Sequence, residues 1–198
     1  MKDKLLRLKT DFPYFCRTCL KIRTKSGKVT PLILNKAQLH FYNKVQEQLE
    51  TMGRVRLTVV KGRQQGLSTV IEALGFWRTI FTHGTNTFIL THEKEATKNL
   101  FNMAKRYYEH FPLKDFLQTK EDSSTSLSFS GLESGYKVGT AGNKGVGRSD
   151  TVQFFHGSEV AFWQHASEHA AGVLQTVPNE DGTHVIFEST ANGIGNFF

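Results

Sequence analysis

One stretch, residues 55–82, limits the folds open to this chain more than any other. Its first six residues are mostly β-branched or apolar, which suits a buried strand. A polar loop with two glycines follows, and apolar side chains then recur at helical spacing from Val70 to Phe81. Backbone N–H groups converge on a loop between a strand and a helix, and the helix N-terminus adds partial positive charge. The stretch therefore predicts a phosphate-binding loop, or alternatively a βα turn whose glycines serve only chain reversal.

The loop departs from the usual phosphate-loop pattern GxxxxGK[ST]. Gly66 fits the second glycine and Ser68 the hydroxyl that holds Mg²⁺, but Leu67 stands in place of the lysine. A phosphate site needs a cation that reaches the β- and γ-phosphates. Arg63 is the best-placed candidate and Lys61 the reserve, because arginine can contact two phosphate oxygens at once. The other candidate phosphate-binding residues in the loop are Gln64, Gln65 and Thr69.

The net charge of +7 is concentrated at the N-terminus. Residues 1–30 hold nine Lys or Arg and two acidic residues, whereas residues 31–198 hold 16 of each. This distribution predicts a basic N-terminal arm and lead-in over 1–30, followed by one α/β domain over 31–198. A basic arm can bind nucleic acid or an acidic partner, or it can be a solvated leader.

The two cysteines, Cys16 and Cys19, form a single CxxC pair. Without a second pair this is a weak sign of zinc, and two free thiols in a reducing cytosol are the favoured interpretation. The sequence has no run of about 18 apolar residues, so no membrane span is predicted. The charged start has no hydrophobic signal region, so no secretion signal is predicted either.

The rest of the pattern predicts a mostly parallel β-sheet flanked by helices. Asn35 is a candidate N-cap for the first of the helices. Helical spacing covers about 36–51, 93–111 and 164–175. Strands are predicted at 87–90, 152–155 and 183–188, with a hairpin of 126–129 and 135–138 at one side of the sheet. In parallel sheets ligands bind beyond the carboxyl ends of the strands, where the glycine-containing loop lies.

A nucleotide hydrolase also needs a carboxylate beside the phosphate loop to orient or deprotonate the attacking water. Glu159, shortly after the strand at 152–155, is the candidate. Ser158 replaces the Asp that usually precedes this carboxylate; it can hydrogen-bond a metal-bound water but adds no charge.

Two further polar segments follow strands. The glycine-rich loop at 140–150 carries Lys144 and Arg148, and it either contacts phosphate or is a plain loop. Short polar side chains after the last strand can sense the γ-phosphate through hydrogen bonds, or can simply form a turn. They are Ser189, Thr190 and Asn192.

Four stretches, in this order, resemble the ATPase domain of the large terminase subunit of tailed double-stranded DNA bacteriophages, the DNA-packaging motor. They are LILNKAQ (32–38), KGRQQGLST (61–69), FFHGSEVAFW (154–163) and FESTANGIGNFF (187–198). Residues 88–112 also resemble the second βα unit of that family. The resemblance covers about 30–198, and it implies a P-loop NTPase fold of the ASCE type that binds ATP and Mg²⁺.

The resemblance implies roles for individual residues in nucleotide binding. Gln38 matches a glutamine that recognises adenine. Arg63 matches the cation that this family often moves to the start of the loop. Gly66, Ser68 and Thr69 match the rest of the phosphate-binding loop.

The resemblance also implies roles in catalysis and coupling. Glu159 matches the catalytic carboxylate, and Ser158 stands where many members have Asp and would act on the metal through water. Arg148 lies where some members carry an arginine finger that reaches a neighbouring subunit's γ-phosphate. The residues that match the motif coupling hydrolysis to DNA movement are Ser189, Thr190 and Asn192.

The leading interpretation is an ATP-hydrolysing motor domain that moves viral double-stranded DNA into a procapsid, in the cytoplasm of the host cell. The implied partners are double-stranded DNA, the portal protein, the small terminase subunit and further copies of the chain in a ring. The family also has a C-terminal nuclease domain with clustered acidic residues; the six Asp here are scattered, so no DNA cleavage is expected. The alternatives are a helicase-like P-loop ATPase, or a hydrolysis-deficient nucleotide- or DNA-binding module, since Leu67 and Ser158 remove charge from the site.

Overall fold

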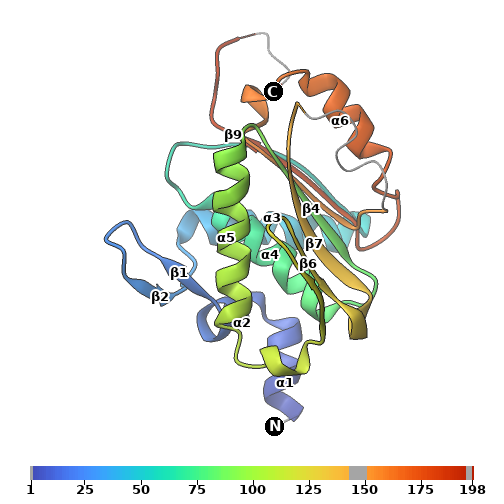
Figure 1. Ribbon diagram of the computed structural model, residues 1–198. Coiled ribbons are helices and arrows are strands. Elements are labelled where there is room, and N and C mark those ends of the chain that lie inside the picture. The colour runs from blue at the N-terminus through green and yellow to red at the C-terminus, as the bar shows by residue number, and fades with distance from the viewer. Residues whose placement is uncertain (1, 143–150, 195–197) are drawn as a thin grey trace.

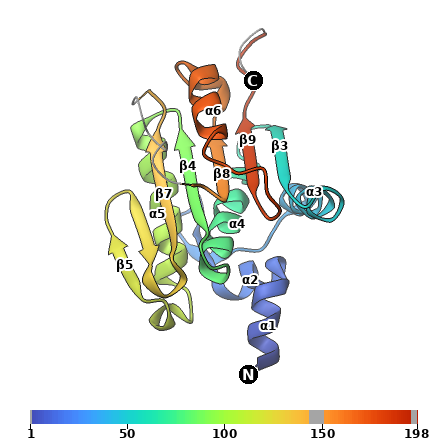
Figure 2. The ribbon, with the colours of Figure 1, turned by 90° about the vertical axis from the view of Figure 1, so that its right-hand side faces the viewer.

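The fold is built on a seven-stranded β-sheet, seen in a computed structural model that describes residues 2–142, 151–194 and 198 (Figure 1). The strands of this sheet are β3 (Val55–Val60), β4 (Asn86–Thr91), β5 (Thr119–Asp122), β6 (Ser126–Phe129), β7 (Ser134–Thr140), β8 (Phe154–Ser158) and β9 (His184–Ser189). They lie side by side in the order β3-β9-β8-β4-β7-β6-β5 (Figure 2). The first five strands in this order, from β3 through β9, β8 and β4 to β7, run parallel to one another. β6 is antiparallel to β7, and β5 is antiparallel to β6. The predicted mostly parallel sheet flanked by helices is confirmed, as is the hairpin at one side.

Helices cover both faces of the sheet. The α-helices are α1 (Lys2–Thr10), α2 (Phe12–Cys19), α3 (Lys36–Met52), α4 (Leu67–Phe81), α5 (Lys94–Glu109) and α6 (Ala166–Leu174). Short 3₁₀ turns are η1 (Lys114–Phe116), η2 (Ser130–Leu132) and η3 (Val160–Phe162). Within the described residues, no helix combines the length and the apolar character needed to cross a membrane.

Two hydrophobic cores form because side chains alternate across the sheet. On β8, Phe154 faces the larger core under α4 and α5, whereas Phe155 faces a smaller core that includes Val173 of α6. Ile89 and Leu90 on β4 divide between the two cores in the same way. The central strands are therefore apolar on both faces, as continuous apolar runs in a parallel sheet require.

β3 is less buried than its composition predicts. Val55 is fully buried, but Val60 is 69% exposed and the residues between them are partly or fully exposed. β3 is the last strand of the sheet, so it has β9 as a neighbour on one side only. The apolar run at 55–60 was expected to be a buried strand, and it is instead a half-covered edge strand.

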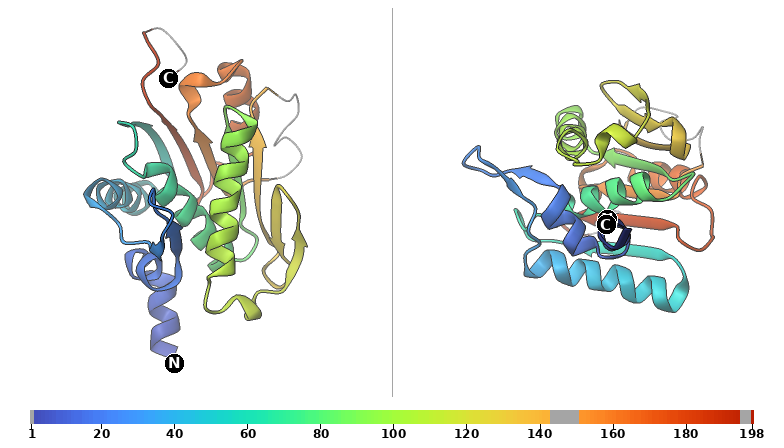
Figure 3. Two further views of the ribbon diagram at one scale, coloured as in Figure 1. Left: turned by 60° about the vertical axis from the view of Figure 1, so that its left-hand side comes forward. Right: turned by 90° about the horizontal axis from the view of Figure 1, so that it is seen from below.

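The N-terminal residues pack against the domain. Phe12 and Phe15 on α2 are completely buried, and Trp77 Nε1 on α4 donates a hydrogen bond to the carbonyl oxygen of Leu8 at 2.8 Å. A hairpin of β1 (Lys21–Arg23) and β2 (Val29–Pro31) then projects from the body (Figure 3).

Both cysteines lie on α2. They are free, as the sequence predicted, and both are buried; burial raises the pKa of the Cys19 thiol to about 11. A neutral, buried thiol is a poor metal ligand and a poor nucleophile.

Candidate active site

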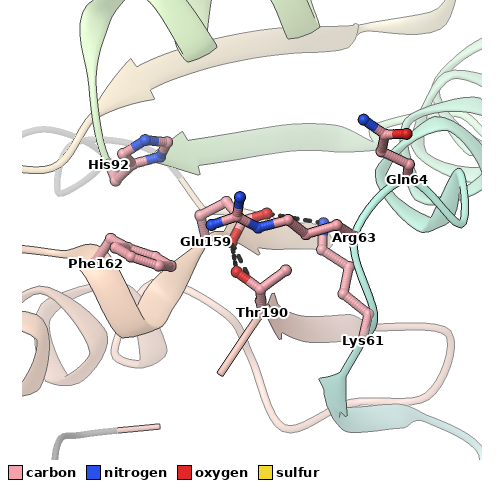
Figure 4. A pocket seen from close by; sticks show the side chains of 7 residues that line it. All are labelled: Lys61, Arg63, Gln64, His92, Glu159, Phe162 and Thr190. Atoms are coloured by element: carbon pink, nitrogen blue, oxygen red, sulfur yellow. Dashed lines mark hydrogen bonds and ion pairs between the residues drawn. The ribbon is translucent and has the colours of Figure 1, made fainter. Parts of the chain in front are cut away.

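A pocket of about 380 Å³ lies at the carboxyl ends of the parallel strands (Figure 4). Lys61 follows β3, His92 follows β4, Glu159 follows β8 and Thr190 follows β9. Arg63, Gln64 and Phe162 complete the lining. The strand order thus brings together residues that are up to 129 positions apart in the sequence, at the edge where parallel sheets bind ligands.

The loop between β3 and α4 is shaped by Gly66, the N-cap of α4. Its φ of 74° is left-handed, and a Cβ there would lie 2.8 Å from Gln38 Nε2. Glycine is therefore required on grounds of both conformation and space. Ser68 and Thr69 lie in the first turn of α4, and the Thr69 carbonyl accepts a hydrogen bond from Tyr107 at 3.1 Å.

Two side chains at the N-terminus of α3 hydrogen-bond to this loop. Gln38 Nε2 donates to the Gly66 carbonyl at 2.7 Å, and Asn35 Nδ2 donates to the Gln65 carbonyl at 3.1 Å. Gln38 Oε1 also accepts from the Asn35 backbone N–H at 2.9 Å, which completes a capping box. Gln38 is only 4% exposed. Its amide therefore braces the loop in this structure, and recognition of adenine stays a prediction.

Two non-glycine residues of the site have left-handed backbone. Gln64 in the loop has a φ of 65°, and Glu159 has a φ of 53°. Gln64 Oε1 accepts a hydrogen bond from Lys25 in the turn of the β1–β2 hairpin. Strained backbone of this kind gathers at functional sites, where surrounding contacts hold it in place.

Lys61, the reserve candidate for the loop cation, contacts three polar side chains of the site. Its Nζ lies 3.0 Å from Ser68 Oγ and 3.1 Å from Glu159 Oε1, and it forms an ion pair with Glu188. Arg63 is exposed, and its guanidinium extends from the loop toward Glu159 (Figure 4). Leu67 is 6% exposed and belongs to the core. Both cations therefore face the pocket, while the residue at the usual lysine position does not.

The Glu159 carboxylate is held from two sides. Oε1 pairs with Lys61, and Oε2 accepts from the Thr190 N–H at 3.2 Å and the Thr190 hydroxyl at 3.1 Å. Ser189 Oγ lies 3.4 Å from the same oxygen, and Asn192 Nδ2 donates to the Ala161 carbonyl at 3.0 Å. The segment after β9 is therefore fastened to the turn that carries Glu159.

A buried polar network, which the sequence reading missed, continues from Lys61 into the sheet. Glu188 and His156 lie on neighbouring strands, with His156 Nε2 3.4 Å from Glu188 Oε1. His156 Nδ1 lies 2.7 Å from Glu72 Oε1 on α4, and Tyr136 on β7 donates to Glu72. All four side chains are completely buried. The signal in the sequence was an ionisable residue in the interior of each of two mostly apolar central strands, His156 in β8 and Glu188 in β9.

Charge pairing keeps His156 and Glu188 ionised despite their burial. Burial alone would raise the pKa of Glu188, but the His156 hydrogen bond and charge, together with Lys61, lower it to about 2. Burial would lower the pKa of His156, but its hydrogen bonds to Glu188 and Glu72 raise it to about 9. His156 is therefore an imidazolium between two carboxylates at neutral pH.

The oxygen donors near the loop suit Mg²⁺. They are the hydroxyls of Ser68 and Ser158 and the carboxylates of Glu159 and Glu188. No cluster of three or more His, Cys, Asp or Glu that could hold a metal occurs in the described ranges. A nucleotide site does not need one, because Mg²⁺ there takes one or two carboxylates together with phosphate oxygens and water. Arg148 lies outside the described residues.

The strand order and the position of the loop between β3 and α4 define the α/β architecture found in P-loop NTPases. Comparison with solved structures narrows this: the chain has the fold of large terminase ATPase domains. The large terminase of bacteriophage HK97 is similar with a TM-score of 0.72 and 13% identity, over 91% of this chain and 37% of that one. The large terminase ATPase domain of Thermus phage P74-26 is similar with a TM-score of 0.57 and 18% identity, over 76% of this chain and 65% of that one.

A third similar structure is a large terminase from a thermophilic bacteriophage in complex with ADP. Its TM-score is 0.54 and its identity 13%, over 79% of this chain and 38% of that one. This chain therefore spans less than two thirds of the length of each of these proteins. No family model and no curated protein matches the sequence.

Proposed function

We propose that this chain is the ATP-hydrolysing motor domain of a terminase large subunit. The observation that carries the proposal is the position of Glu159: it lies in one pocket with Lys61 and Arg63. A phosphate-binding loop with nearby cations, facing a carboxylate at the end of a neighbouring strand, is the arrangement that nucleotide hydrolysis needs. The ADP complex of a similar fold supports binding of a nucleotide.

The residues divide the work of hydrolysis between them. The loop backbone and α4 N-terminus bind phosphate oxygens, and Lys61 and Arg63 stabilise the negative charge that grows there. Ser68 would hold Mg²⁺, which neutralises phosphate charge when bound. Glu159 accepts a proton from the attacking water. Because Thr190 and Lys61 fix its two oxygens, the carboxylate is oriented before the substrate arrives.

The proposal also includes the coupling of ATP hydrolysis to DNA movement. The contacts of Ser189 and Thr190 with Glu159, and of Asn192 with Ala161, give a direct mechanical link from the catalytic turn to the segment after β9. We propose that this segment passes the hydrolysis event to surfaces that grip the backbone of double-stranded DNA. Such a grip would be independent of sequence and sensitive to salt. Portal protein, small terminase subunit and a ring of further copies, with Arg148 acting between copies, complete the proposed assembly.

The test is phosphate release from Mg·ATP by the purified protein, at low and high protein concentration, with and without double-stranded DNA. Glu159→Ala should lower kcat by about 10²- to 10⁴-fold, the usual contribution of a general base, while nucleotide binding persists. Arg63→Ala should weaken ATP binding because the loop loses a phosphate contact. The matched controls are Glu121→Ala on the exposed edge strand β5 and Arg17→Ala on α2, which should behave as wild type.

The outcomes separate two functions. Activity that rises with protein concentration and disappears in Glu159→Ala supports a motor whose site is completed between subunits. ATP binding without hydrolysis, at every protein concentration and with or without DNA, favours a binding-only module. The ion pairs of Lys61 with Glu159 and Glu188 would then explain why hydrolysis does not occur. An Arg63→Ala variant that hydrolyses ATP normally contradicts the assignment of that residue.

A further inference from the structure

Glu188 is a completely buried carboxylate on β9. It lies near the end of β9, and β9 runs between β3, which leads into the phosphate loop, and β8, which leads to Glu159. Its backbone neighbours across the sheet are Val59 and Ser158. A buried charge is costly unless it serves a purpose that an apolar residue cannot. No step of the proposed hydrolysis uses it so far.

The contacts of Glu188 divide between its two oxygens. Oε2 pairs with the Lys61 ammonium. Oε1 accepts hydrogen bonds from Ser68 Oγ at 2.8 Å and from Ser158 Oγ at 2.8 Å, while His156 Nε2 approaches it to 3.4 Å. A mere counter-ion for Lys61 would need only Oε2. The second oxygen instead joins the hydroxyl of the phosphate loop to the residue at the position where a carboxylate is missing.

We propose that Glu188 supplies, from the neighbouring strand, the metal-site carboxylate that position 158 lacks. The inference rests on the proposed function, because it concerns the Mg²⁺ of the same nucleotide site. In this arrangement Ser68 is the hydroxyl ligand, and Glu188 orients that hydroxyl and accepts hydrogen bonds from metal-bound water. Ser158 hydrogen-bonds the same carboxylate oxygen and so helps to fix its rotamer.

The proposal also assigns a role to Lys61 when Mg·ATP binds. Its Nζ contacts Ser68, Glu159 and Glu188, so one ammonium sits among the groups that a divalent cation would share. Lysine and a metal ion cannot both pair fully with those oxygens. Binding of Mg·ATP would therefore move Lys61 from the carboxylates to the phosphates, where a loop cation is needed.

The experiment measures binding of Mn²⁺, an oxygen-seeking substitute for Mg²⁺, to the protein–ADP complex by electron paramagnetic resonance. ADP binding without metal is measured alongside by calorimetry. Glu188→Gln should weaken Mn²⁺ binding by at least about tenfold, as loss of an outer-sphere carboxylate does, with little change in metal-free ADP binding. Glu72→Gln is the matched control: it removes a buried carboxylate of the same network that contacts neither serine. It should lower the melting temperature comparably but change Mn²⁺ affinity by less than about threefold, since it acts only through His156.

Two further variants keep the test decisive if Glu188→Gln does not fold. Glu188→Asp keeps the charge beside Lys61 and His156 but withdraws the carboxylate from the serines, so Mn²⁺ affinity should still fall severalfold. Adding Ser158→Asp to either variant should recover most of the affinity, because the carboxylate returns from β8.

The outcomes also distinguish this inference from the proposed function. Wild-type protein that binds Mn·ADP with the same affinity as Glu188→Gln or Glu188→Asp overturns the inference and leaves the ATPase proposal standing. If adding Ser158→Asp does not restore Mn²⁺ affinity in the Glu188 variants, the inference is overturned as well. Wild-type protein that binds no ADP, with or without metal, overturns both.

Discussion

His184 is a histidine that the folded protein holds in its neutral form. Burial, helped by the charge of Arg78, lowers its pKa from 6.5 to about 3. The unfolded chain therefore binds one more proton than the folded chain between those values. The free energy of unfolding should fall as the pH falls from 6.5 toward 3, by up to about 1.4 kcal/mol per pH unit.

His184→Asn tests this at the residue scale. Asparagine can keep the donor that Nδ1 offers to the Gly182 carbonyl, but it does not titrate. Urea unfolding at several pH values should show a shallower acid slope in the variant, together with a general loss of stability from the missing ring, which stacks on Phe154. His110→Asn, at an exposed histidine, reports the effect of losing a histidine as such. An unchanged acid slope in His184→Asn would contradict the prediction.

Sequence reasoning at this scale found the residues near the chain's motifs but not their partners. Arg63 and Lys61 were both identified, with Arg63 preferred because of its chemistry; the structure gives Lys61 the ion pairs. Glu159 was placed by its position after a strand. Glu188 could not be assigned, because its role depends on β9 lying between β3 and β8, and strand order is not readable from local pattern.

At the scale of elements, the N-terminus of α3 stabilises both its own helix and the loop between β3 and α4. Asn35 Oδ1 accepts from the Gln38 N–H at 2.9 Å, while its Nδ2 donates to the Gln65 carbonyl. Asn35→Ala should lower the free energy of unfolding by about 1 kcal/mol through loss of the cap. It should also weaken nucleotide binding, because the loop loses a brace.

Asn35→Asp separates the two effects. Aspartate keeps the cap acceptor but has no donor for Gln65, so thermal stability should stay near that of wild type while nucleotide affinity falls. Melting temperature and calorimetric binding measured on both variants check this. Equal affinity in wild type and both variants would show that the brace has no bearing on the site.

Most helices and strands of the domain were predictable, but the two N-terminal helices and the exposure of the edge strand β3 were not. The helices at α3, α4 and α5 and the strand β4 follow from apolar spacing over many residues. α1 and α2 escaped prediction because they are short, and α1 is largely charged and exposed; the tertiary contacts of α2 decide its packing. The burial of β3 was overestimated for a related reason: composition does not tell which strand ends the sheet.

At the scale of the whole molecule, the N-terminal helices belong to the main core. The Phe15 ring lies 5.6 Å from Phe81 on α4 and 6.1 Å from Phe111 beyond α5, measured between ring centroids. Phe15→Ala should therefore cost about 3–5 kcal/mol in the free energy of unfolding, as for any buried aromatic. Leu6→Ala, at a residue that is 62% exposed, should change it by less than about 0.5 kcal/mol.

Chemical denaturation followed by Trp fluorescence measures both variants. A single transition that shifts to lower urea in Phe15→Ala means that the N-terminal helices unfold together with the sheet. If Phe15→Ala were as stable as Leu6→Ala, the N-terminal helices would instead be a separate, dispensable attachment.

The pairing around Lys61 also bears on how fast a nucleotide arrives. The pocket and its buried extension hold three cations, Lys61, Arg63 and His156, and three carboxylates, Glu72, Glu159 and Glu188. Such a balanced set adds little long-range field of its own, so any attraction of an anion at a distance comes from the other residues of the chain, which has a net charge of +7 overall. Selectivity within the pocket would then come from the exchange of ion-pair partners after the encounter.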